Sequence, residues 1–449
     1  MASIQKTKNG DFRIRVSAGF DGNGKRRFFS ETYTPTSKTP KAIEKEVTHH
    51  AEVLEEKVSK GKISIDGGIK FSDLVEKWVT GWAVDNLTES QVDSYTRNLE
   101  LYVIPFLGNL RLSKIKKSHC QQVIDDMKEK GLSVGTMKRA VCAMSSVLKY
   151  ALRLEIINAL PYDRDRQLII PKDTKDNEIH CFSVEQSRTF LSALRLQYPV
   201  KYGQRKRSDS EGNTYSVTGY EVEKSIPLQW QAYFTLALMG GLRKGEMLAL
   251  EWRDIDFEER SVSITKAIAN TKKHGQIVKS TKTESGKRTV HVPLECIELL
   301  EAWRDEQIEM SSLSAWEGNK DIEKNPVFIQ DTGKRMDLYT PTAKFKKVLN
   351  TYNRYIDSLI EEADTEAQKK ALLEKKLPVI RLHDLRHCFA TLLISEGVDI
   401  VTVSKVMGHA SPSITTDVYS HLLAKKNKEV ADVFTRLLCD DRKEVQLRA

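Results

Sequence analysis

Four short segments in the C-terminal half of the chain carry side chains that could act on a phosphate group. They are GGLRKGE at 240–246, a strand and turn segment that contains Lys282, RLHDLRH at 381–387, and MGH at 407–409, ten residues before Tyr419. Arginine suits phosphate because its planar guanidinium donates two parallel hydrogen bonds and never loses its charge. Two arginines and a lysine meeting at one point would therefore stabilise the negative charge that gathers on a phosphodiester under attack.

The histidines, the lysine and the tyrosine could supply the remaining steps of such a reaction. His383 and Arg386 are three residues apart, so on a helix they share a face. The phenol of Tyr419 could attack phosphorus, and its pKa of about 10 makes phenolate a tolerable leaving group when a hydroxyl attacks back. Lys282 would suit the role of general acid toward a departing sugar oxygen.

The elements expected around these residues indicate how they are held. We expect residues 276–283 and 287–292 to form a pair of strands, joined by a turn with Lys282 at its edge. Lys279 and Lys287 lie near the same turn, so the choice of lysine stays open.

In order and spacing, these motifs resemble the tyrosine recombinase, or phage integrase, family over about residues 180–425. The resemblance implies a DNA-cutting and rejoining enzyme that works through a 3′-phosphotyrosyl intermediate, without a metal ion or other cofactor. It implies that Glu246 is a supporting buried acid and that His387 is a neighbour of the site. The residues that the resemblance assigns to catalysis are Arg243, Lys282, His383, Arg386, His409 and, as nucleophile, Tyr419.

The length of 449 residues suggests about three domains. The fold class expected is multidomain: a small α+β domain at 1–65, an all-α domain at 66–165, a linker at 166–182, and a mainly α catalytic domain with a small antiparallel sheet at 183–449. The resemblance implies that the first domain binds arm-type DNA sites and that the second is a SAM-like core-binding domain.

The first domain is predicted from a hairpin signal, with strands over 12–16 and 25–33 and a helix over 39–60. Its basic residues could contact a duplex groove, although an ordinary solvated sheet face is the alternative. The candidates are Arg13, Arg15, Lys25, Arg26 and Arg27.

Helical periodicity runs through 71–160, and Thr88 and Ser183 are expected to begin helices. Two stretches interrupt the third domain: 200–225, expected to be a mobile loop, and 350–377, expected to be a charged helical insert.

Composition limits the remaining classes. The net charge of +9 is consistent with nucleic acid as a partner, and the six cysteines show no zinc spacing. No apolar run has the length of a membrane span or a signal peptide, so we expect a cytoplasmic protein of a bacterial host.

We therefore predict an integrase that integrates and excises a mobile element such as a prophage or transposon. Its expected partners are double-stranded DNA, further copies of the chain forming a tetramer, and an accessory excision or DNA-bending protein. The apolar stripe over 425–440 could pack on its own domain or on a neighbouring subunit. A catalytically silent DNA-binding regulator, a resolvase or invertase, and a topoisomerase-like nicking and closing enzyme remain alternatives.

Overall fold

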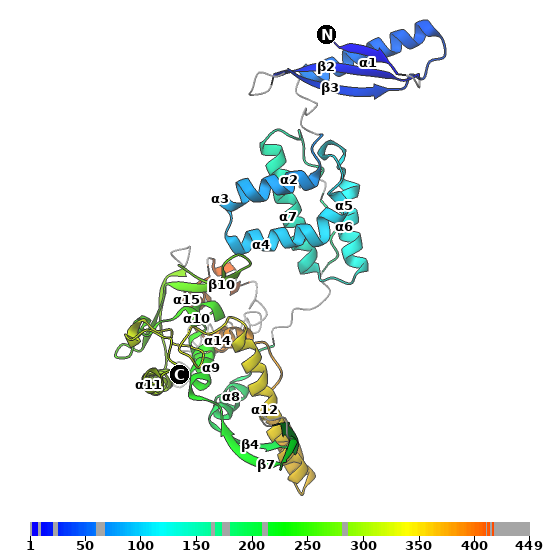
Figure 1. The fold of residues 1–449 in the computed structure, drawn as a ribbon. Helices are drawn as coiled ribbons and strands as arrows, with labels where there is room; N and C mark the ends of the chain where they lie inside the picture. Colours follow the sequence, from blue (N-terminus) through cyan, green and yellow to red (C-terminus); the bar gives the residue numbers. More distant parts are fainter. Residues whose placement is uncertain are drawn as a thin grey trace, which may run out of the picture. The chain divides into compact units, whose positions relative to one another are not determined.

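The structure is a computed structural model that divides into two compact units, Met1–Asp176 and Asn177–Ala449 (Figure 1). The residues that it describes are 2–7, 10–20, 26–59, 68–162, 167–172, 180–208, 214–280, 286–409, 411–413 and 415–416.

The N-terminal part of the first unit is a three-stranded antiparallel sheet with one helix on its face. Its elements are β1 (Ser3–Lys6), β2 (Phe12–Phe20), β3 (Arg26–Tyr33) and α1 (Pro40–Ser59). Alternate residues of a strand face opposite sides, so Ile14 and Val16 are buried against α1 while Arg13 and Arg15 are exposed. The expected hairpin and helix are therefore confirmed.

The rest of the first unit is helical, as the periodicity predicts. Its elements are α2 (Phe71–Trp78), η1 (Val79–Ala83), α3 (Val84–Asn86), α4 (Glu89–Asn98), η2 (Leu99–Val103), α5 (Ile104–Leu107), η3 (Leu112–Lys114), α6 (Lys117–Glu129) and α7 (Val134–Arg153). Thr88 begins α4 as predicted, because its hydroxyl accepts a hydrogen bond from the Gln91 backbone N–H. The fully buried rings of Phe71 and Trp78 belong to the core of this bundle.

In the second unit, the described strands form small antiparallel sheets among helices. Its elements are α8 (Val184–Arg195), β4 (Gln197–Tyr202), β5 (Arg205–Ser208), β6 (Thr214–Val217), β7 (Tyr220–Ser225), α9 (Leu228–Gly240), α10 (Lys244–Ala249), η4 (Trp252–Asp254), β8 (Ile255–Asp256), β9 (Ser261–Ile264), β10 (Lys266–Thr271), β11 (Gly275–Ser280), β12 (Arg288–His291), α11 (Leu294–Ser311), η6 (Ile322–Lys324), α12 (Thr340–Glu362), α13 (Glu366–Glu374), α14 (Asp384–Ser395) and α15 (Ile400–Met407).

Helix α9 lies at the centre of this unit. Nine of its residues are buried, and they are distributed around the whole circumference of the helix. This explains why the helix is apolar all round and not amphipathic. It contacts α8, α10, α11 and α14, so it connects segments that are more than 150 residues apart in sequence. The expected Ser183 cap of α8 is confirmed, since the Ser183 hydroxyl accepts from the Gln186 N–H at 3.1 Å.

The expected pairing of 276–283 with 287–292 is wrong. β11 pairs with β10, and β12 pairs with β9. A tight turn joins β10 to β11: the His274 N–H donates to the Thr271 hydroxyl, and Gly275 supplies a positive φ of 65°. β12 instead places Val290 opposite Val262, and both valines are buried, so the sheet with β9 gains an apolar cross-strand pair.

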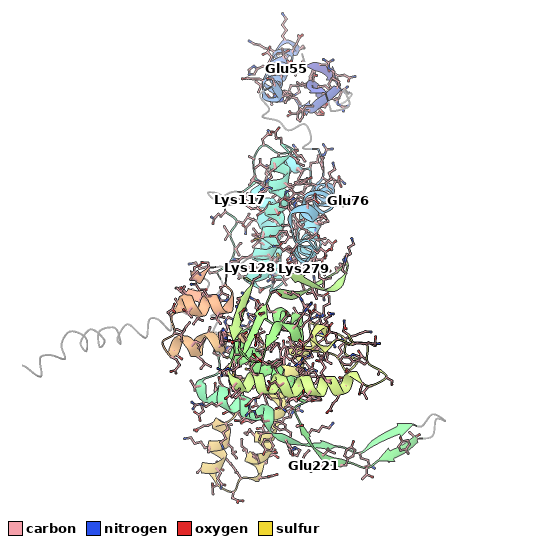
Figure 2. All side chains as sticks on the ribbon, turned by 90° about the vertical axis from the view of Figure 1, so that its left-hand side faces the viewer. Glu55, Glu76, Lys117, Lys128, Glu221 and Lys279 are labelled. Carbon is pink, nitrogen blue, oxygen red and sulfur yellow. The ribbon has the colours of Figure 1, made fainter. Side chains whose placement is uncertain are left out.

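The prediction of a mobile loop over 200–225 is also wrong for its described residues. They form an antiparallel ribbon in which β4 pairs with β7 and β5 pairs with β6. Figure 2 shows the ribbon projecting from the unit, with Glu221 labelled on β7. Tyrosine and valine recur along these strands and favour extended backbone, a preference that outweighs the polar neighbours.

The charged insert over 350–377 is helical, as expected, and comprises the end of α12 together with α13. The first strand of the ribbon packs on the charged insert: the ring of Tyr198, on β4 just before residue 200, lies edge-on to Tyr355 on α12, with centroids 5.6 Å apart. The predicted fold class is confirmed: a strand and helix domain, a helical domain, and a mainly helical domain with small antiparallel sheets. No described helix has the length and apolarity needed to cross a membrane.

Candidate active site

Arg243 reaches its position because α9 ends abruptly. Gly241 adopts a φ of 62°, and a Cβ there would lie 2.4 Å from the Phe389 ring, so glycine is required on both counts. The chain then enters α10 at Arg243, whose backbone N–H donates to Glu246 Oε2 at 2.9 Å. Its guanidinium donates to Glu246 Oε1 at 2.8 Å and to the carbonyl of Gly408 at 3.0 Å. Arg243 is thereby fixed to two separate segments.

Glu246 is the buried carboxylate that organises the cluster. Only 3% of its surface is exposed, and it accepts two parallel hydrogen bonds from Arg288, at 3.1 and 2.8 Å, in addition to those from Arg243. Burial alone raises the pKa of a carboxyl group, but the bonds and charges of Arg288 and Arg243 lower the pKa of Glu246 to about 2. Glu246 is therefore ionised at every pH at which the protein would work.

Arg386 is held by the main chain. It is buried, with 3% of its surface exposed, and donates to the carbonyl oxygens of Gly241 and Met407, both at 2.5 Å. These two carbonyls come from the ends of α9 and α15, so one guanidinium bridges the loops that carry Arg243 and His409. Because carbonyl groups are dipoles without net charge, the positive charge of Arg386 is oriented by them and not cancelled.

His383 stands at the N-terminus of α14, one turn before His387. Their rings are perpendicular, with centroids 5.3 Å apart. His383 is an exposed residue, yet the surrounding protein atoms desolvate its ring and lower its pKa to about 4, with His387 and Arg386 adding repulsion. Burial lowers the pKa of His387 in the same direction. Both imidazoles are therefore neutral near pH 7.

His409 follows Gly408, which ends α15 with a φ of 66°. Its Nδ1 lies 2.7 Å from the hydroxyl of the fully buried Thr415, a contact that fixes the orientation of the ring. Desolvation, and then the charges of Arg386 and Arg243, lower the pKa of His409 to about 4. A neutral imidazole oriented in this way can donate one hydrogen bond and accept another.

The segments that carry Arg243, Arg288 and His409 meet at Gly408. A Cβ on this residue would lie 2.6 Å from Nη1 of Arg288, and Arg288 also donates through Nε to the carbonyl of Val406. The sequence pattern does not single out Arg288. The sequence does contain a signal for a role of Arg288. On a strand it shares the inward face with Val290, and a buried arginine requires a charged or polar partner. Thr415 carries no such signal.

The structure thus brings together Arg243, Glu246, His383, Arg386, His387 and His409 from the sequence-based prediction, and adds Arg288 and Thr415. Lys282 and Tyr419 lie outside the described residues. Lys279, one of the two other lysines near the predicted turn, lies on β11 and is labelled in Figure 2. In the described ranges, no group of three or more His, Cys, Asp or Glu side chains is placed to hold a metal ion.

Three of the N-terminal candidates lie on the exposed face of the three-stranded sheet. Arg13 and Arg15 on β2 and Arg26 on β3 are exposed. The guanidinium of Arg15 lies over the ring of Phe28, 3.9 Å from its centroid. Lys25 lies outside the described residues, and only the backbone of Arg27 is described. The exposed sheet face therefore carries cations next to an aromatic ring.

Comparison with known proteins identifies relatives along almost the whole chain. The Phage integrase family matches residues 217–426, and the N-terminal SAM-like domain of phage integrases matches residues 70–128. The ICEBs1 integrase of Bacillus subtilis strain 168 is 26% identical over 442 residues, covering 97% of this chain and 100% of the relative. The transposase of transposon Tn916 from Enterococcus faecalis is 23% identical, covering 82% of this chain and 80% of the relative.

Solved structures show the same fold. An integrase of transposon Tn1549 in complex with transposon right end DNA has a TM-score of 0.59 at 19% identity, covering 82% of this chain and 99% of that chain. The predicted resemblance is confirmed by the two family matches, one to the catalytic part and one to the helical part of the chain.

Proposed function

The chain belongs to the phage integrase family of tyrosine recombinases, and from this membership we propose that it integrates and excises a mobile DNA element through a covalent phosphotyrosine. The observation that carries the proposal is the cluster around Gly408, where Arg243, Arg386 and His409 meet from three segments. Relatives named as the ICEBs1 integrase, the transposase from transposon Tn916 and a probable integrase of prophage ps2 support the same class of substrate.

The proposed reaction begins with attack of the Tyr419 phenol on a DNA phosphorus atom. A bond forms between the phenol oxygen and phosphorus, and the bond to the 5′-oxygen of the next nucleotide breaks. The phenol proton passes to a neutral imidazole, and Lys282 gives a proton to the departing oxygen. The phosphate remains on the 3′ end as a phosphotyrosyl ester, so its bond energy is kept for rejoining and no outside energy source is consumed.

Arg243 and Arg386 would bind the two non-bridging oxygens of the reacting phosphate. Both guanidiniums are fixed before DNA arrives, by Glu246 and by main-chain carbonyls, so little reorganisation is needed as charge develops. His383 and His409 would then act as neutral groups, one accepting the phenol proton and the other donating to a phosphate oxygen. This division of roles requires both imidazoles to be neutral, and their lowered pKa values keep them neutral near pH 7.

The finer assignments belong to the same proposal. Residues 1–65 would bind arm-type sites through the exposed cations of the sheet, residues 66–165 would bind the core site, and 183–449 would carry catalysis. The enzyme would act as a homotetramer on double-stranded DNA in the bacterial cytoplasm, with an accessory protein setting direction. The positive net charge of the chain supports a steep loss of affinity with salt, because released counterions dominate binding to DNA.

The test is trapping of the covalent adduct. The probe is a nicked duplex made from the joined ends of the element that carries the gene, in which a short fragment diffuses away after cleavage. We expect an adduct that survives denaturation with the native chain and with Tyr339→Phe, a control at an exposed tyrosine of the same unit. We expect no adduct with Tyr419→Phe, although its DNA affinity should stay within about twofold because one hydroxyl is removed.

Other results would point elsewhere. Native protein that binds this DNA and never forms an adduct would support the silent regulator. Relaxation of supercoils without any site preference would support a topoisomerase-like enzyme. Adduct formation by Tyr419→Phe would assign the nucleophile to another residue.

A further inference from the structure

A tyrosine on α9 has no role in the proposed reaction and yet lies beside its residues. Tyr233 is fully buried, and in the described part of the chain its hydroxyl has no hydrogen-bond partner. Its ring is held edge-on against Phe328, with centroids 4.8 Å apart, and against Phe234 at 5.4 Å. The ring is therefore well packed, while the hydroxyl at its end has no hydrogen bond to any group in the described ranges.

Such a hydroxyl is costly. Burying a hydroxyl without a hydrogen bond destabilises a protein by about 1–3 kcal/mol, and phenylalanine would fill the same volume without that penalty. Tyr198 in the same unit shows the ordinary solution, because its buried hydroxyl donates to the carbonyl of Ala193. The hydroxyl of Tyr233 therefore calls for a partner other than the protein groups that the structure describes.

The surroundings indicate what that partner is. Tyr233 lines a small cavity together with Ala237, Lys244, His383 and Arg386. The space open to the centre of a water molecule is about 10 Å³, which is close to the volume that one water needs. A buried water is stable where it has two to four polar partners. The Tyr233 hydroxyl and the His383 imidazole would supply two of them, and Lys244 and Arg386 also line the cavity.

We propose that Tyr233 is a positioning residue whose hydroxyl holds the imidazole of His383 through one water molecule in this cavity. The inference rests on the proposed function, in which His383 acts on the scissile phosphate. The phenol of Tyr233 stays protonated because burial raises its pKa, so it always has a proton to donate to the water. The water then donates to His383, and the ring nitrogen that faces the cavity is kept as an acceptor.

This arrangement fixes the tautomer of His383. When the nitrogen toward the cavity is an acceptor, the neutral ring carries its proton on the other nitrogen, away from the cavity. A hydrogen bond donated to a ring nitrogen also favours the neutral form, and so lowers the pKa of His383 further. The other charged and titratable groups near this ring are His387, Arg386, Asp384 and Arg243, and Lys244 lines the same cavity. Of these, only Asp384 favours protonation, and it is already bound to Arg381.

The experiment compares Tyr233→Phe with the native chain. We expect unchanged DNA affinity and an acid limb of the rate profile moved toward neutral pH. We also expect a cleavage rate lower by about tenfold, the lower end of the loss found when a partner that orients a metal-bound histidine is removed. Nitrogen-15 spectra of His383 in the DNA-free protein should show a mixture of tautomers and a raised pKa. Ala237→Val keeps the hydroxyl but fills the space for the water, so it should give the same spectral change.

Tyr198→Phe is the matched control: it removes a buried hydroxyl that has a protein partner, and should lower stability without moving the His383 spectrum or the acid limb. The inference is overturned if Tyr233→Phe keeps the native rate, pH profile and His383 spectrum, because Tyr233 would then only fill space. The spectra need no DNA and no cleavage, so they decide the role of Tyr233 even if the native chain forms no adduct and the proposed function fails.

Discussion

Replacement of Glu246 by glutamine is the sharpest test of how the site is held. The substitution keeps the shape of the side chain but removes its charge, so both Arg243 and Arg288 lose an ionised partner. Glutamine also replaces one acceptor oxygen by an amide that donates, and this amide would face a guanidinium that can only donate. The substitution therefore removes one of the hydrogen bonds around residue 246 and leaves both arginines without an ionised partner there.

The expected loss follows from the pKa of Glu246, which falls from 4.5 to about 2 on folding. Each pKa unit is worth about 1.4 kcal/mol, so the ionised carboxylate contributes about 3 kcal/mol to the free energy of unfolding. Because the folded pKa lies below the unfolded one, this contribution is complete above pH 4.5 and is lost as the pH falls toward 2. Glu246→Gln should therefore cost about 3 kcal/mol at pH 7 and only about 1 kcal/mol at pH 3.

The assay is urea unfolding of the full chain, followed by tryptophan fluorescence at pH 7 and at pH 3. Four of the six tryptophans (230, 252, 303 and 316) lie in the second unit, so the signal reports mainly on the unit that contains Glu246. Glu366→Gln is the control, because Glu366 pairs with Lys369 at 3.0 Å but its side chain is 89% exposed. Such a surface pair contributes less than about 1 kcal/mol.

Two results would refute this reasoning. One is a loss at pH 7 no larger than that of Glu366→Gln, which would mean that the carboxylate does not organise the cluster. The other is a large loss that is equal at pH 3 and pH 7, which would trace the effect to packing and not to charge. The cleavage rate of Glu246→Gln should fall together with its stability, since an arginine without a fixed orientation is not preorganised for phosphate.

Three further predictions concern the segment around Gly408. Gly408→Ala places a Cβ 2.6 Å from Arg288 at a φ of 66°, so unfolding measurements should show a loss of more than about 1 kcal/mol, larger than for Gly397→Ala, where φ is 94° but the space is open. Thr415→Val removes the hydroxyl that orients His409 and should slow cleavage by about tenfold with unchanged DNA affinity; a native rate would show that the contact is dispensable. The pKa of His409 is lowered from 6.5 to about 4. The fold is therefore fully stable with respect to this group above pH 6.5 and loses stability as the pH falls toward 4. Over that pH range, the urea midpoint of the native chain should drop more than the urea midpoint of His409→Asn.

The residues that carry charge and chemistry could be predicted from the sequence because their types are few and their functions narrow. Arginines next to glycine-rich segments and a histidine one helical turn from an arginine already suggest a phosphate site. The helices could be predicted as well, since periodicity and capping residues such as Thr88 and Ser183 are local signals.

What could not be predicted depends on pairing between distant strands. The segment over 287–292 was expected to pair with the strand before it, but its register with β9 is decided by burial of Val262 and Val290. That register is also what turns Arg288 toward Glu246. A local reading of the sequence treats Arg288 as one more basic residue near a turn, because its importance arises only when α10, β12 and α15 are brought together.

The balance of charge at the site explains why the buried acid and the neutral histidines belong together. Among the described side chains around Gly408, Arg243, Arg288 and Arg386 contribute three positive charges and Glu246 one negative charge, so with neutral imidazoles these side chains keep two net positive charges, to which a protonated Lys282 would add. A phosphodiester carries one negative charge, and gains a second on its non-bridging oxygens as a nucleophile adds. A site with an excess of at least two positive charges therefore favours the reacting state over the bound ground state. Protonated histidines would strengthen binding of the ground state as well, and would remove the base that the proposed attack requires.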